Sequence, residues 1–160
     1  MKPWLRLTLV TATVGGGFTG VAITLQALGT AREQQPAFFI LMLCFLALFA
    51  FVTTSGVVFV HDPNRTNPLI VALALQVPWF SSPVVAYKFT AGFQVSAALL
   101  GGHFAVGFHL GSTFQINFFQ HLPWGVGINF FALALLFTIP HNFMQRIRTS
   151  QRSLASGSEY

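Results

Sequence analysis

The chain has 160 residues, of which 54% are hydrophobic and only 7% are charged, and it contains 19 Phe. Soluble domains carry about 25% charged residues, and disordered chains combine low hydrophobicity with high charge, so both classes are excluded. The composition predicts a small polytopic membrane protein, and the length predicts a single domain.

The formal net charge is +5, and the placement of the basic residues is more informative than their number. They gather at both ends of the chain beside apolar segments, as on the cytoplasmic side of a membrane. A nucleic-acid interface needs a denser basic surface with base-stacking groups, so direct nucleic-acid binding is not expected. We expect the basic termini to contact the lipid bilayer or a soluble cytoplasmic partner, through Lys2, Arg6, Arg146, Arg148 and Arg152.

Four segments are apolar enough to span a bilayer, which takes about 20 residues. They lie at 5–28, 37–60, 68–85 and 124–143. Two cytoplasmic ends require an even number of spans, and four satisfies this. The first segment imitates a signal peptide, but its apolar stretch runs to Leu28, longer than the usual core of about 7–15 residues. We therefore expect an integral protein of the bacterial inner membrane, with cytoplasmic termini and a disordered polar tail at 150–160.

The segment 86–119 is also hydrophobic, but its apolar residues recur at every second position. Such alternation is typical of a half-buried strand rather than a helix. The expected fold class is an α-helical polytopic membrane protein with four transmembrane helices and an extracytoplasmic antiparallel β-hairpin inserted between helices 3 and 4. Together these would form one membrane domain over residues 1–149.

A diglycine at Gly101 and Gly102 suits a two-residue type I′ turn, which needs positive φ at both central residues. With that turn, the apolar residues of the two strands face each other on one side of the hairpin, whereas a three-residue turn would put them on opposite sides. The predicted pairs include Leu99 with Phe104, Val95 with Phe108, Phe93 with Leu110, Phe89 with Phe114, Gln94 with His109 and Thr90 with Thr113. Gly92 and Gly111 lie nearly opposite each other and are expected to let the ribbon bend.

An isolated hairpin is marginally stable in water, so something must cover this apolar side. The membrane interface, the chain's own helices and neighbouring subunits are all candidates, and open strand edges favour the subunits. In the first span, small residues spaced by four predict a close helix contact, within the chain or between chains. The candidate oligomer interface is therefore Phe89, Phe93, Val95, Phe104, Phe108, Leu110, Phe114, Gly16 and Gly20.

Residues with catalytic or metal-binding chemistry are scarce. His103 and His109 share a strand face but are about 20 Å apart at 3.3 Å per residue, too far to bind one ion. Away from the span ends, where Arg6 and His141 lie, no acid or base falls inside a predicted span, which argues against coupled transport. Gln76 precedes Pro78, where it could satisfy freed backbone groups or line a small cavity. We expect no catalytic residue, no metal and no cofactor.

The leading hypothesis is a non-enzymatic subunit of an oligomeric membrane complex, with a structural or sensor role for the hairpin. A small oligomeric channel is an alternative, because the first span is rich in hydroxyl groups. A lipid-modifying enzyme is a third, with His61, Asp62 and His121 near the interface. The predicted layout is also loosely similar to that of small bacterial inner-membrane sensor subunits, such as the membrane component of the Kiwa anti-phage system. That resemblance implies a sensor in a defence system and carries over no site residue.

Overall fold

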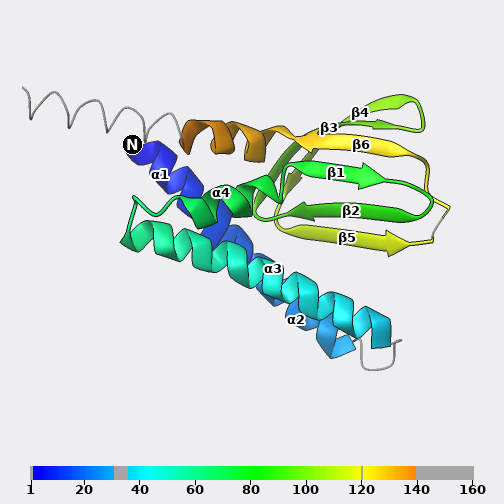
Figure 1. Ribbon diagram of the computed structural model, residues 1–160, viewed down its shortest axis with the longest axis horizontal. Coiled ribbons are helices and arrows are strands. Elements are labelled where there is room, and N and C mark those ends of the chain that lie inside the picture. The colour runs from blue at the N-terminus through cyan, green and yellow to red at the C-terminus, as the bar shows by residue number, and fades with distance from the viewer. Residues whose placement is uncertain (1, 31–35, 120, 140–160) are drawn as a thin grey trace, which may run out of the picture.

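The computed structural model describes residues 2–30, 36–119 and 121–139. Helical segments come first: α1 (Pro3–Val10), the π-helical turn η1 (Thr11–Gly15), α2 (Gly16–Thr30), α3 (Pro36–His61) and α4 (Asn67–Ala74). The strands follow as β1 (Pro78–Ser81), β2 (Val85–Thr90), β3 (Phe93–Leu100), β4 (His103–Leu110), β5 (Thr113–Phe118) and β6 (Gly125–Asn129). A short apolar helix, Phe130–Ile139, continues from β6. The sheet lies to one side of the long helices, with β4 at its far edge (Figure 1).

Two helices in the described part of the chain are long and apolar enough to span a membrane. One is the continuous helix Pro3–Gly29 formed by α1, η1 and α2, and the other is α3. They pack closely, because a Cβ on Gly20 would lie 2.1 Å from the Phe49 ring and one on Gly17 would lie 2.3 Å from Thr53 Oγ1. The small residues of the first helix therefore pack against a helix of the same chain.

Most hydroxyl groups of the first helix bond back to its own backbone. Thr13 Oγ1 donates to Leu9 O at 2.7 Å, and Thr24 Oγ1 donates to Gly20 O at 2.8 Å. Thr8 and Thr19 make the same bond four residues back. This arrangement satisfies the hydroxyl groups without a polar partner helix.

The six strands form one antiparallel sheet in the order β4-β3-β6-β1-β2-β5. The residue pairs predicted for the hairpin are all present: Leu99 faces Phe104 and Phe93 faces Leu110 between β3 and β4. Between β2 and β5 the same register continues, with Phe89 facing Phe114 and Thr90 facing Thr113. Gly101 and Gly102 both have positive φ, as the predicted turn requires.

The ribbon bends at Gly92 and Gly111, which have φ values of 85° and 113°. Gly111 N donates to Gly92 O at 2.7 Å, so the two bends are joined. A Cβ on Gly16 would lie 2.4 Å from Gly92 N, because the start of α2 packs directly against this bend. The bend separates β2–β5 from β3–β4, and β6 and β1 fill the space between β3 and β2.

The predicted four-span fold is wrong. The expected third span, 68–85, is the short helix α4 followed by β1, and the expected fourth, 124–143, is β6 followed by the helix Phe130–Ile139. Pro78 begins β1, where its missing N–H and fixed φ are incompatible with a helix interior. In β6, Val126 and Ile128 alternate with glycines, which are poor helix formers. The hairpin is thus part of a six-stranded sheet rather than an isolated insert.

Two apolar clusters hold the described residues together. One joins α1, α4, the end of α3 and the helix Phe130–Ile139, around residues such as Leu9, Phe59 and Leu69. The other joins the middle of α3 to the sheet, around Phe49 and Phe89. The sheet is therefore anchored to the helices at one side, near β2 and β5.

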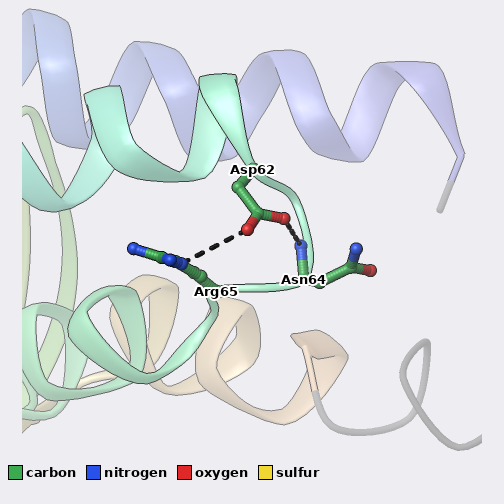
Figure 2. Close-up of polar contacts among 3 residues, drawn as sticks. All are labelled: Asp62, Asn64 and Arg65. Carbon is green, nitrogen blue, oxygen red and sulfur yellow. Dashed lines mark hydrogen bonds and ion pairs between the residues drawn. The ribbon is translucent and has the colours of Figure 1, made fainter.

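A short polar turn connects α3 to α4. Asn64 N donates to Asp62 Oδ1 at 3.1 Å, and Arg65 Nε lies 3.3 Å from Asp62 Oδ2 (Figure 2). Arg6 Nη2 donates to Val60 O at 2.9 Å, which places the start of α1 beside the end of α3. The N-terminal basic residues and Arg65 therefore lie toward the same end of the helical pair.

Candidate functional site

One face of the sheet is apolar across all six strands. Residues paired across neighbouring strands point to the same side, and one such row runs Phe104, Leu99, Val126, Phe80, Tyr87 and Ile116. This apolar face has two parts with different surroundings.

Over β2 and β5, the helix α3 covers the apolar face. Phe89 is 1% exposed, and its ring centroid lies 4.8 Å from that of Phe49. Phe114 lies 4.5 Å from Phe45, again between ring centroids. We call this region the covered part. Together with the contact between Gly16 and Gly92, it fixes the sheet to the helical pair.

Over β3, β4 and β6, no described element covers most of the apolar face. Four large side chains of β4 are between 70% and 73% exposed: Phe104, Val106, Phe108 and Leu110. Leu99, Val126 and Ile128 extend this surface onto β3 and β6, and they are 52%, 64% and 43% exposed. We call these seven residues the open part. An uncovered patch of this kind marks a contact with protein or membrane.

The strand β4 is also an edge of the sheet. It pairs with β3 on one side, and all eight of its residues are exposed. Figure 1 shows the β3–β4 end projecting away from the α2–α3 pair. The outer backbone groups of an edge strand are a template for pairing with another strand.

The structure separates the residues proposed as an oligomer interface. Phe104, Phe108 and Leu110 lie in the open part, and Phe93 and Val95 are half-buried beside it. Phe89 and Phe114 lie in the covered part, where α3 already contacts them. Gly16 and Gly20 pack inside the chain, against Gly92 and Phe49.

Among the proposed membrane-surface residues, Lys2 and Arg6 are exposed at the start of α1. Arg146, Arg148 and Arg152, like the polar tail, lie outside the described residues.

Gln76 has the role of a backbone partner. It is 4% exposed, its Nε2 donates to Ala72 O at 2.9 Å, and its Oε1 accepts from Ala91 N at 2.9 Å. The side chain thus links the end of α4 to the bend of the ribbon, where regular hydrogen bonding stops. This was one of the two roles expected from its place before Pro78.

The opposite face of the sheet contains polar groups that the sequence did not single out. A cavity of about 190 Å³ is lined by Trp79 of β1, Lys88 of β2, Gln94 and Ser96 of β3, and Gly107 of β4. Strands far apart in the sheet order contribute to this one cavity, so the sheet curls around it. The signal in the sequence was the charge: Lys88 is the only Lys, Arg, Asp or Glu between Arg65 and Arg146.

Within residues 2–30, 36–119 and 121–139, no three His, Cys, Asp or Glu residues lie close enough to hold a metal ion. Asp62, considered above for a lipid-modifying enzyme, pairs with Arg65 in an exposed turn. No protein-family model matches this chain, and no curated protein or solved structure matches it significantly.

Proposed function

We propose that this protein is a non-enzymatic subunit of an oligomeric membrane complex, in which copies of the chain meet through the open part and the edge of β4. The observation that carries this proposal is the exposure of β4, where four large apolar side chains are each at least 70% exposed on an edge strand. Fully burying such side chains contributes about 1.5–3 kcal/mol each.

The backbone of β4 gives a second argument. Lipid offers no hydrogen bonds, and each unsatisfied backbone group there costs several kcal/mol. An edge strand beside an apolar helical pair therefore needs either water or another strand. The simplest closed arrangement pairs β4 of one copy with β4 of a second copy around a two-fold axis.

The two long apolar helices would anchor the complex in a bilayer. The described residues contain an even number of such helices, and the bond between Arg6 and Val60 brings Lys2, Arg6 and Arg65 toward one end. By the excess of basic residues on cytoplasmic loops, we assign this end to the cytoplasmic side of a bacterial inner membrane. A soluble partner that binds the basic end would then sit opposite the β3–β4 end of the sheet, which would serve as a structural or sensing platform.

Mass measurement of the full chain in a mild detergent tests this proposal. The unaltered chain should be a dimer or higher oligomer, and replacing Phe104, Phe108 and Leu110 with Ser should reduce it to a monomer. Phe18→Ser is the matched control, because Phe18 is 67% exposed on α2 and lies outside the sheet. A monomeric unaltered chain, or a triple variant of unchanged mass, would contradict the proposal.

A small pore is the second candidate. The curled sheet carries apolar residues on its outer face and polar residues such as Gln94 and Ser96 toward its cavity, which is the alternation that transmembrane strands show around an aqueous lumen. Purified chain in planar bilayers should then conduct, and a Lys88→Glu variant should reverse any preference for anions. An absence of conductance at all potentials would remove this candidate.

The defence-sensor alternative depended on the four-span layout and has no other support.

A further inference from the structure

The cavity on the face of the sheet opposite the apolar face has a wall that depends on a glycine. Trp79 lies across the sheet from Ala98, and a Cβ on Gly127 between them would be 2.3 Å from the Trp79 ring. Gly127 pairs with both Trp79 and Ala98. A side chain at position 127 would therefore displace the indole that forms one wall of the cavity.

Gln94 supplies a buried polar group without a partner. It is 2% exposed and lines the cavity, yet no described residue donates a hydrogen bond to its Oε1. Asn129 pairs with Ser96 on the neighbouring strand, and its Nδ2 is the other buried side-chain atom that lacks a partner among the described residues. Because buried polar groups in native proteins are nearly always hydrogen-bonded, an unpaired one beside a cavity needs a water or a ligand.

Lys88 supplies a charge that the described residues leave unbalanced. Its side chain lines the same cavity and makes no hydrogen bond or ion pair with a described residue. The described acid Asp62 is engaged with Arg65 at the α3–α4 turn. Lys88 is half-buried as a residue, and an ammonium group with no nearby carboxylate attracts a small anion.

We propose that this cavity binds a small organic anion that carries a hydroxyl group beside its charge. Lys88 would bind the anionic group, and Gln94 Oε1 would accept a hydrogen bond from the hydroxyl group. Ser96, whose Oγ donates to Gly107 O at 3.4 Å, keeps lone pairs free on the cavity wall, and Trp79 would pack against the carbon skeleton. At about 190 Å³ the cavity has room for a ligand of only a few non-hydrogen atoms. The cavity shares β4 with the proposed pairing edge, through Ala105, Val106 and Gly107. Ligand binding and oligomer mass are separate measurements, so failure of this proposal is distinguishable from failure of the proposed function.

Lactate and propionate are matched probes, because they differ only in the hydroxyl group. With ¹⁵N-labelled full-length chain in detergent micelles, lactate should shift the Trp79 indole N–H signal in a saturable way. Trp4 and Trp124, which are 61% and 72% exposed away from the cavity, serve as internal references. Propionate should bind about tenfold more weakly, since it leaves Gln94 unpaired.

Variants test the separate roles of Lys88, which would bind the anionic group, and Gln94, which would bind the hydroxyl group. Lys88→Gln should weaken lactate binding at least tenfold, whereas Lys2→Gln, which removes the other lysine, should leave it unchanged. Gln94→Met should lower the affinity for lactate to that for propionate. Absence of a Trp79 shift, or binding that survives Lys88→Gln, would overturn the anion site, and equal affinity for the two acids would overturn the role of Gln94. The comparison of the acids uses the unaltered chain, so it decides the question even if a variant does not fold.

Discussion

The covered and open parts of the apolar face have the same kind of sequence and different surroundings. Phe89 and Phe108 both lie at alternating apolar positions of one continuous ribbon, yet Phe89 is 1% exposed and Phe108 is 70% exposed. The bend at Gly92 and Gly111 separates them, with β2 and β5 against α3 and β3 and β4 beyond its reach. The alternation of apolar residues along the strands determines which face of the sheet is apolar. The position of α3 determines how much of that face stays exposed for contact with a partner.

The largest effect is expected from the covered part. Phe49→Ala should lower the free energy of unfolding by about 3–5 kcal/mol, because Phe49 is fully buried between Gly20 and the Phe89 ring. Phe108→Ala, in the open part, should change the stability of the isolated subunit by less than about 0.5 kcal/mol. Unfolding of both variants in mild detergent, under conditions that keep the chain monomeric, measures the difference. Equal losses would show that the two parts are not distinct.

The next largest effect on stability is expected where α2 packs closely against α3. Gly20→Ala should destabilise the chain by about 1–3 kcal/mol, since the new Cβ would lie 2.1 Å from the Phe49 ring. Gly29→Ala is the matched control, because no described residue lies within 4 Å of the Cβ added there. Thermal melting of both variants checks this. A neutral Gly20→Ala would mean that α2 and α3 do not pack as described.

The hydrogen bonds of Gln76, which link α4 to the ribbon bend, should contribute a similar or smaller amount to the free energy of unfolding. Gln76→Leu leaves the buried Ala91 N–H and the Ala72 carbonyl without their side-chain partner, which costs about 1–3 kcal/mol for a buried group. Amide hydrogen exchange at Ala91 should accelerate in the variant, while exchange in the β3–β4 pairing stays unchanged. Exchange at Ala91 equal to that of the unaltered chain would contradict the role of Gln76.

The smallest effect is expected at the α3–α4 turn. Side chains of Arg65 and Asp62 are 75% and 44% exposed, and exposed ion pairs contribute about 0–1 kcal/mol. Arg65→Gln should therefore leave the melting temperature nearly unchanged. A large loss would mean that the turn is buried in an assembly, which would place an interface away from β4.

The register of the hairpin could be predicted from the sequence because the alternation, the diglycine turn and the apposed glycines agree with one another. The strands β1 and β6 were missed because Pro78–Ser81 and Gly125–Asn129 lie in apolar runs that hydropathy alone assigns to membrane spans. The signals against a helix were present as Pro78, Pro83 and the glycines at 125 and 127. The inner cavity could not be predicted, since it depends on curling of the sheet, which brings Lys88 near Gln94 from different strands.

Amide hydrogen exchange along β4 tests the central claim most directly. If copies of the chain pair at this edge, the outward amides of β4 should exchange slowly in the assembled protein and rapidly once Phe104, Phe108 and Leu110 are replaced with Ser. Amides that exchange rapidly in the unaltered chain, at the rate found in the triple variant, would show that no strand pairs with β4.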